Sequence, residues 1–342
     1  MLISIRYNFR NPAPWTRPSA YLYKRVLDQI EWADRIGFDR VALAEHHFLD
    51  EGFLPGLMVA ASAIAARTRR VLIDSEILLA PLHHPVRLAE DAALVDIISN
   101  GRLTLSVAGG YREEEYAALG MKLSERAGRM EECLQIIKRC WIEEEFSWDG
   151  KYYQLKNVRM TPKPVQPGGP KLILGGGAEA VARRAARFAD GFQPMSPTLW
   201  EAYFDELERL GRPPARRTAP SRAPTFVHVT HTPERDWELV RPHALYEIQQ
   251  YQAWGLTSPA FQAAATSEEA LRELHAVWTP DQARQIILRQ QREWPDSIFS
   301  FAPILAGMDP EMAQSSLELL AEHVLPELHA LRGADPLAAR SA

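Results

Sequence analysis

Short runs of β-branched and other hydrophobic residues alternate along the chain with longer stretches in which hydrophobic residues recur every three or four positions. The first pattern predicts buried strands and the second predicts amphipathic helices. Eight strands are expected, at residues 2–7, 40–44, 71–79, 103–108, 171–174, 191–194, 225–230 and 297–303. Regular alternation of strands and helices is typical of βα units with a parallel sheet.

Two of the predicted helices have clear ends. The helix at 21–36 repeats hydrophobic residues at helical spacing and is followed by Gly37, a common stop residue. The helix at 85–98 begins with Pro85 in its first turn and is followed by Asn100 and Gly101. Each helix has one polar face, so each is expected to pack against another element.

The number of βα units favours a closed (β/α)8 TIM barrel over an open sheet. An open dinucleotide-binding sheet would carry a glycine fingerprint after its first strand, and residues 8–18 contain none. A barrel with insertions also fits a chain of 342 residues. We therefore predict one barrel domain over residues 1–332, followed by a flexible tail at 333–342.

Two segments interrupt the alternation of strands and helices. Residues 143–154 contain an Asp149-Gly150 turn between aromatic residues, which predicts a small β-hairpin. Residues 253–280 are rich in glycine, proline and small residues and are expected to form an irregular excursion. Long excursions beside a catalytic face commonly carry substrate contacts.

Charge and composition exclude several classes of function. The net charge is −5, and the 39 basic residues are interspersed with 44 acidic ones, so no nucleic-acid partner is expected. No hydrophobic run approaches the roughly 18 residues of a membrane span, and no signal peptide is expected. Cys133 and Cys140 are interpreted as reduced structural thiols, which is typical of a cytoplasmic protein.

Candidate catalytic residues follow the second predicted strand in the segment Glu45-His46-His47-Phe48. The carboxyl ends of parallel strands form the catalytic face of a barrel, and a histidine there can transfer protons at neutral pH. Histidines at such positions can equally cap or pack, so both interpretations stay open from the residues alone.

Clustered histidines also raise the possibility of zinc, with His83 and His84 after the third strand as further ligands. Adjacent side chains on an extended segment point in opposite directions. Neither histidine pair can therefore easily present both rings to one metal ion, and no metal site is expected.

A phosphate site is predicted at Gly175-Gly176-Gly177, between the strand at 171–174 and a helix that starts near Ala178. Glycines allow close approach of the backbone, and the free N–H groups of a helix N-terminus favour an anion. The alternative is a tight turn. Arg126 opens another helix, where a cation is disfavoured unless an anion is near, so it is a candidate phosphate partner or an ordinary surface arginine.

Taken together, these motifs resemble the bacterial luciferase family. The matching segments, in the same order and spacing, are Glu45–Phe48, Leu79–Asp91, Asp96, Gly101–Leu103, Gly175–Gly177 and Ala189–Gly191. The likeness covers about the first 230 residues well and the rest loosely. What it implies is a flavin monooxygenase barrel that binds FMN, obtains it reduced from a separate reductase, and uses oxygen to oxidise an organic small molecule.

The resemblance also implies roles for individual residues. His46 matches the catalytic histidine of the family and Glu45 its neighbour in the pocket floor. The positions that match cofactor-binding residues are Leu79, Ala80, Ala108, Arg126, Gly175, Gly176, Gly177 and Ala178. Leu79 and Ala80 correspond to the end of the third strand, where family members commonly have a non-proline cis peptide beneath the flavin ring.

The chain departs from the light-emitting luciferases in one place. Ala108-Gly109 stands where those enzymes have a reactive cysteine followed by a phosphate-contacting arginine, so bioluminescence is not expected and one phosphate contact is absent. Two alternatives stay open: a deazaflavin-dependent hydride-transfer enzyme of the same fold, and a non-catalytic flavin-binding paralogue. By analogy with relatives, we expect a homodimer through the apolar segment 57–66.

Overall fold

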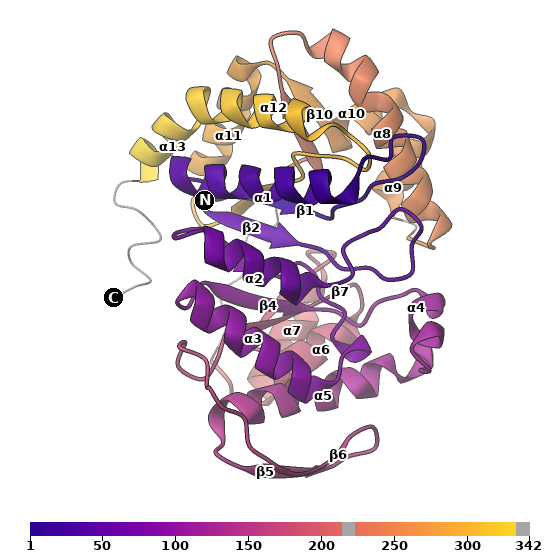
Figure 1. The fold of residues 1–342 in the computed structure, drawn as a ribbon, viewed down its shortest axis with the longest axis vertical. Coiled ribbons are helices and arrows are strands. Elements are labelled where there is room, and N and C mark those ends of the chain that lie inside the picture. Colours follow the sequence, from indigo (N-terminus) through magenta and orange to yellow (C-terminus); the bar gives the residue numbers. More distant parts are fainter. Residues whose placement is uncertain (214–222, 257, 333–342) are drawn as a thin grey trace. The chain divides into compact units, whose positions relative to one another are not determined.

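The structure, a computed structural model, describes residues 1–213, 223–256 and 258–332 (Figure 1). The predicted tail at 333–342 lies outside the described residues. The described residues group into two compact units. The first contains residues 1–42, 49–54 and the described residues after position 217, and the second contains residues 43–48 and the described residues from 55 to 217.

The first unit is built on parallel strands. They are β1 (Leu2–Tyr7), β2 (Arg40–Leu43), β9 (Phe226–Val229), β10 (His275–Trp278) and β11 (Ile298–Phe301). β1 pairs with β11 in parallel, with Leu2 opposite Ile298, and β2 lies on the other side of β1. β9 and β10 form a separate parallel pair. Most of these strand residues are buried, as expected where helices cover a parallel sheet.

The helices of the first unit begin and end at recognisable signals. They are α1 (Ser19–Ile36), α8 (Pro233–Ala253), α9 (Pro259–Thr266), α10 (Glu268–Leu274), α11 (Pro280–Glu293), α12 (Pro310–His323) and α13 (Leu325–Arg332). α1 ends at Gly37 in the left-handed conformation, with φ of 104°. Thr279 and Gln282 form a capping box at the start of α11. α12 packs against α1, α11, α13 and β9.

The second unit has four parallel strands in the order β3-β4-β7-β8 and a separate antiparallel hairpin. The parallel strands are β3 (Leu72–Asp74), β4 (Leu103–Val107), β7 (Lys171–Gly176) and β8 (Gly191–Pro194). The hairpin consists of β5 (Phe146–Asp149) and β6 (Gln154–Val158), which confirms the hairpin prediction. The carboxylate of Glu132 accepts hydrogen bonds from the backbone N–H groups of Lys151, Tyr152 and Tyr153 and so stabilises the turn of the hairpin.

Helices of the second unit pack in two groups. The helices are α2 (Leu57–Arg67), α3 (Pro85–Ser99), α4 (Glu113–Ala118), α5 (Arg126–Ile142), α6 (Glu179–Phe188) and α7 (Leu199–Arg209), with short 3₁₀ turns at Ala80–Leu82 and Leu123–Glu125. α3 packs against both α2 and α5, and α6 packs against α7 (Figure 1). α3 ends at Asn100, which has the left-handed φ of 57° that terminates the helix.

All eight predicted strands are present, with ends that differ by up to five residues. The largest difference is in β3, which ends at Asp74 instead of residue 79 because the N–H of Leu78 bonds back to the carbonyl of Ser75 and closes a turn. The segment predicted as an irregular excursion contains α9, α10 and β10 instead. The α/β fold with parallel strands is confirmed, whereas the closed (β/α)8 barrel is not, because β9 and β10 pair apart from the other parallel strands.

Two further expectations concern the thiols and the membrane. Cys133 and Cys140 are buried and free, and burial raises the pKa of Cys133 to about 12 and that of Cys140 to about 11. Both thiols are therefore protonated at neutral pH. Among the described residues, no helix has the length and apolar character needed to cross a bilayer.

Candidate active site

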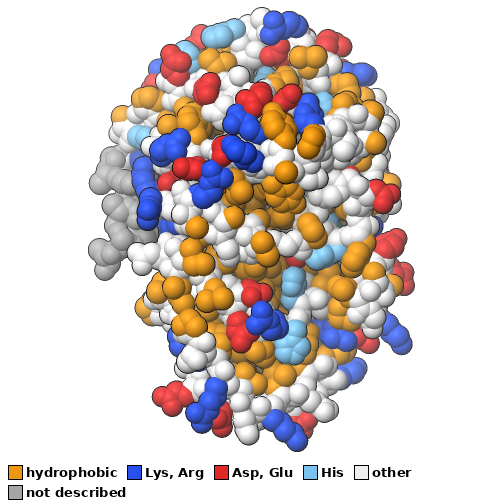
Figure 2. Space-filling view, viewed as in Figure 1, with side chains coloured by type: hydrophobic (Ala, Val, Ile, Leu, Met, Phe, Trp, Pro, Cys, Tyr) orange, Lys and Arg blue, Asp and Glu red, His pale blue; other side chains and the backbone are white. Residues whose placement is uncertain are grey.

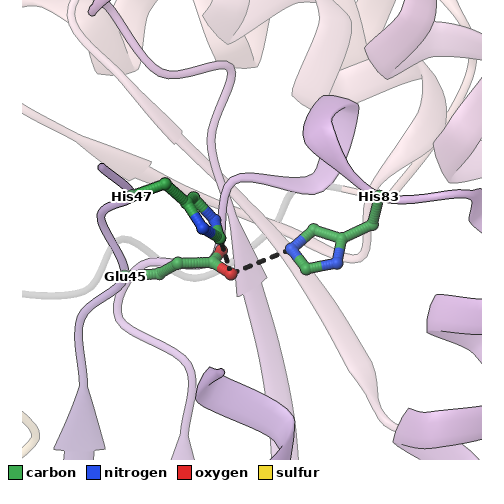
Figure 3. A group of neighbouring side chains, drawn as sticks. All are labelled: Glu45, His47 and His83. Carbon is green, nitrogen blue, oxygen red and sulfur yellow. Dashed lines mark hydrogen bonds and ion pairs between the residues drawn. The ribbon is translucent and has the colours of Figure 1, made fainter. Parts of the chain in front are cut away.

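The segment Glu45–Phe48 follows β2 and places a buried carboxylate between two imidazole rings. Glu45 is 2% exposed, and its Oε1 lies 2.9 Å from His83 Nε2 and 3.2 Å from His47 Nε2 (Figure 3). Its other oxygen, Oε2, accepts a hydrogen bond of 2.6 Å from the backbone N–H of Leu79. Both carboxylate oxygens of Glu45 are thus held in place by neighbouring residues of the second unit.

Opposing effects determine the ionisation of this cluster. Burial raises the pKa of Glu45, but the contacts with His47 and His83 and the N–H of Leu79 outweigh it and lower the pKa to about 2. Burial lowers the pKa of His83, but the hydrogen bond to Glu45 and its negative charge reverse this, so the net shift is upward. Glu45 is consequently an anion throughout the neutral range.

His46, the predicted catalytic histidine, points to a different partner. Its Nδ1 lies 2.8 Å from Oε1 of Glu115, and its Nε2 lies 3.4 Å from the hydroxyl of Tyr111. His46 is 8% exposed and Glu115 is fully buried. Because an ionised carboxylate can only accept hydrogen bonds, Nδ1 of His46 carries a proton and Nε2 is left to accept or donate one.

Glu115 is a candidate site residue that the sequence analysis missed, because it is the partner of His46. It lies on α4 and also accepts hydrogen bonds from the backbone N–H of His47 at 2.9 Å and from Arg112 at 3.5 Å. Burial raises the pKa of Glu115, but His46, the His47 N–H and Arg112 outweigh it and lower the pKa. The only signal in the sequence is a run of acidic residues, Glu113 to Glu115, and such runs usually start helices.

The glycine loop follows β7, and its glycines lie close to neighbouring side chains. A Cβ at Gly175 would lie 2.2 Å from Ile77, and one at Gly176 would lie 2.8 Å from Val181. A Cβ at Gly177 would lie 3.1 Å from Met195. Ala178 is the N-cap of α6 and is exposed, so the loop leads directly into the N-terminus of that helix.

Arg126 is the first residue of α5 and lies beside the carboxyl end of β4. Its side chain lies 3.6 Å from the position that a Cβ at Gly109 would occupy, and its guanidinium donates to the carbonyl of Leu123 at 3.2 Å. It also lines an open hollow of about 560 Å³, together with Glu113, Ala117, Met121, Lys122, Leu123 and Ser124. The hollow therefore combines two cations with one carboxylate and one hydroxyl group.

The structure changes the prediction for the end of the third strand. The non-proline cis bond joins Glu76 and Ile77, and the bond between Leu79 and Ala80 is trans. Leu79 and Ala80 are 3% and 0% exposed, and Leu79 contributes its backbone N–H to Glu45. Ala108, at the end of β4, donates its N–H to the carbonyl of Leu78. The assignment of Leu79 and Ala80 as cofactor-binding residues therefore stays a prediction, and the cis bond lies three residues earlier in the chain.

The surface carries charges of both signs, and His84 lies apart from the Glu45 cluster. On the face that Figure 2 shows, basic side chains lie among acidic ones instead of forming a patch of one sign. His84 is exposed and packs edge-on to Tyr153 at a centroid distance of 5.8 Å, away from Glu45. The structure thus brings Glu45, His47 and His83 together and leaves His84 outside.

Comparison with known proteins identifies the family. The family model for luciferase-like monooxygenases matches residues 8–313. The chain belongs to the luciferase-like monooxygenase family. Its relatives include F420-dependent dehydrogenases and flavin-dependent monooxygenases.

Three members of this luciferase-like family illustrate the range of relatives. The chain is 28% identical over 325 residues to an F420-dependent glucose-6-phosphate dehydrogenase of Amycolatopsis mediterranei, covering 89% of this chain and 95% of that one. It is 30% identical over 153 residues to the oxygenase component of a flavin-dependent trigonelline monooxygenase of Acinetobacter baylyi. That match covers 44% of this chain and 42% of the relative. The crystal structure of monooxygenase RslO1 from Streptomyces bottropensis matches with a TM-score of 0.78 and 25% identity. That match covers 96% of this chain and 100% of the RslO1 chain.

Proposed function

We propose that the chain is the oxygenase component of a two-component FMN-dependent monooxygenase. In this reaction reduced FMN from a separate reductase and oxygen are used to oxidise an organic small molecule. The observation that carries the proposal is the buried pair of His46 and Glu115. The hydrogen bond between them fixes the orientation and the tautomer of the His46 ring at the carboxyl ends of parallel strands.

The residues around the glycine loop fit the phosphate end of FMN. Gly176 and Gly177 carry no side chains beyond their backbone, and α6 begins directly after the loop, so a phosphate would approach the backbone N–H groups of the loop and of the helix N-terminus. Arg126 and Lys122 add positive charge near the end of β4, the strand that pairs with β7. When bound, reduced FMN would supply the electrons that activate oxygen.

The residues of this chain would then provide proton transfer. Glu115 keeps the proton on Nδ1 of His46, so that Nε2 exchanges a proton with the reacting group, and the Tyr111 hydroxyl lies within reach of that nitrogen. Arg112 and the backbone N–H of His47 keep Glu115 ionised and in position. Glu45, the residue before His46, is itself held by the backbone N–H of Leu79.

A second candidate function is hydride transfer with the deazaflavin F420. It is favoured by the relative from Amycolatopsis mediterranei, which aligns along 89% of this chain and is named for dependence on F420. The same glycine loop and the same His46–Glu115 pair would serve that reaction. The third alternative, a flavin-binding paralogue without catalysis, would keep the loop but has no use for a buried histidine–carboxylate pair.

The test separates the three functions by cofactor and by oxygen consumption. The purified chain is titrated with FMN and, separately, with F420, in oxidised and reduced forms, by calorimetry. Arg126→Ala is expected to weaken FMN binding by about 1–3 kcal/mol, the range of a charge-assisted hydrogen bond. Arg159→Ala, at an exposed arginine that follows β6 and pairs with Glu145, serves as the matched control and should leave affinity unchanged.

The second part of the test follows the chemistry. Mixing the chain with FMN and NADH under anaerobic conditions should not bleach the flavin, whereas adding a flavin reductase and air should give substrate-dependent oxygen uptake. Fast bleaching without a reductase would contradict the two-component proposal. Binding of F420 alone would favour hydride transfer, and FMN binding without oxygen uptake for any substrate of a broad panel would favour the paralogue.

A further inference from the structure

We propose that Glu45, His47 and His83 form a binding site for a divalent transition-metal ion of the zinc type. Oxygen and imidazole nitrogen are the donor atoms that such an ion prefers. The ligand atoms would be Oε1 of Glu45 and Nε2 of both histidines (Figure 3). The proposal does not depend on which flavin the chain uses.

The distances between the three ligand atoms are those of a metal site before the ion enters. Oε1 of Glu45 lies 2.9 Å from Nε2 of His83 and 3.2 Å from Nε2 of His47, and all three atoms lie within 4.8 Å of one another. Two ligands of a tetrahedral zinc ion are about 3.3 Å apart when each bond is about 2.0–2.1 Å long. Small side-chain rotations are therefore sufficient to place all three atoms around one ion.

One ligand atom lacks the partner that a purely hydrogen-bonded cluster would supply. Nε2 of His47 is buried and has no directed hydrogen bond, although it lies in ion-pair range of Glu45. A buried polar nitrogen without a hydrogen bond destabilises the folded chain. A metal ion at the centre of the cluster would use the lone pair of this nitrogen.

The surroundings orient the carboxylate for coordination. The backbone N–H of Leu79 occupies Oε2 of Glu45, which leaves Oε1 directed at the two rings. Hydrogen bonds of this kind around a ligand commonly fix its orientation and strengthen metal binding. Two neutral imidazoles and one carboxylate leave a fourth position open, as in zinc sites with two histidines and one glutamate.

The alternation of side chains along extended backbone explains how the site is assembled. His46 turns to Glu115 while His47 turns to Glu45, so each histidine of the first pair has a separate partner. In the second pair His83 faces Glu45 while His84 is exposed. Neither adjacent pair supplies two ligands, but one ring from each pair reaches the same carboxylate.

The experiment measures metal binding directly, without flavin or substrate. The full chain is stripped with a chelator, dialysed, and titrated with Co²⁺ while the d–d absorption bands of tetrahedral Co²⁺ are followed. Zn²⁺ is then added to displace the cobalt. We expect one Co²⁺ per chain with bands of tetrahedral intensity, and loss of these bands on addition of one equivalent of Zn²⁺.

Variants identify the ligands. Glu45→Gln and His83→Gln should weaken Co²⁺ affinity by about 100-fold or more, since replacement of residues that only support ligands already costs about 10- to 100-fold. His84→Gln is the matched control, because His84 is adjacent to His83 in sequence but exposed and outside the cluster, and its affinity should be unchanged. Circular dichroism measures whether each variant is folded. If Glu45→Gln does not fold, the comparison of His83→Gln with His84→Gln is sufficient for the test.

Two results would overturn the proposal. The first is the absence of tetrahedral Co²⁺ bands in the wild-type chain at a metal concentration of about 1 mM. That concentration is far above the dissociation constants of structural or catalytic zinc sites. The second is equal loss of affinity in His83→Gln and His84→Gln, which would assign the binding to exposed histidines. Either result would leave Glu45, His47 and His83 as a cluster held by hydrogen bonds and ion-pair contacts without a metal ion.

Discussion

At the level of single residues, the buried carboxylate of Glu115 orients the ring of His46. A carboxylate that is fully buried and accepts three donors has little freedom to rotate, so the imidazole that donates to it is fixed in both tautomer and orientation. The hydroxyl of Tyr111 on the other side of the ring then faces the nitrogen that would exchange protons. Glu115 acts through His46 and is a positioning residue in the proposed reaction.

Replacing Glu115 by glutamine tests this role. The amide keeps the shape of the side chain but removes the charge and permits the wrong tautomer of His46, so turnover should fall on the order of 10²-fold or more. The measurements are the pH profile of turnover and the ¹⁵N chemical shifts of the His46 ring, which report the tautomer. Glu114→Gln, on the exposed neighbouring glutamate, is the control. An unchanged tautomer and pH profile in Glu115→Gln would show that Glu115 is only structural.

At the scale of elements, α2 and α3 carry apolar side chains that the second unit does not cover. Val59 on α2 is 76% exposed, and Leu94 and Ile98 on α3 are 46% and 49% exposed. The two helices pack against each other and face the viewer in Figure 1, and hydrophobic side chains gather over them in Figure 2. Exposed apolar groups on adjacent helices are typical of an interface between subunits.

We therefore predict that α2 and α3 form the interface of a homodimer. Val59→Asp would place a charge in that interface, so the dimer should dissociate at concentrations at which the wild-type chain remains dimeric. Light scattering coupled to size-exclusion chromatography measures the mass of each species. The control is Leu239→Asp, on an exposed leucine of α8 in the first unit, which should leave the mass unchanged. A wild-type chain that is monomeric at all concentrations would contradict the prediction.

The stability of the molecule as a whole should depend on pH through three buried or half-buried histidines of the first unit. Burial lowers the pKa of His228, His243 and His275, and for His228 the neighbouring Asp236 only partly opposes this effect. The unfolded chain protonates these rings near pH 6.5, whereas the folded chain does so only at lower pH. The unfolded state therefore binds more protons below that pH, and the free energy of unfolding falls as the pH falls.

Each of these histidines should contribute a slope of up to about 1.4 kcal/mol per pH unit between its unfolded and folded pKa values. Thermal unfolding midpoints at pH 7.5 and 5.5 measure the effect, and His275→Gln should reduce the difference between them because a glutamine side chain cannot be protonated. His323→Gln on α12 is the control and should retain the wild-type difference. Should His275→Gln and the wild-type chain lose the same stability on acidification, this histidine is not a source of the pH dependence.

Local sequence determines most elements of the chain. Gly37 and Asn100 end their helices because they adopt the left-handed conformation, and the apolar runs at β1, β4 and β7 predict buried strands without reference to distant residues. The same local patterns predict that His46 and the glycine loop each follow a strand. β10 escaped prediction because four residues between helices provide too little periodicity to separate a strand from a loop.

The partners of the site residues depend on tertiary structure alone. Glu115 lies 69 positions after His46, and His83 lies 38 positions after Glu45, so no periodicity along the chain relates these residues. Their contacts arise because βα units bring the ends of separate strands to one side of a sheet. Local patterns along the chain therefore predict most strands and helices, whereas the fold alone establishes which carboxylate orients which histidine, because these partners lie far apart in the sequence.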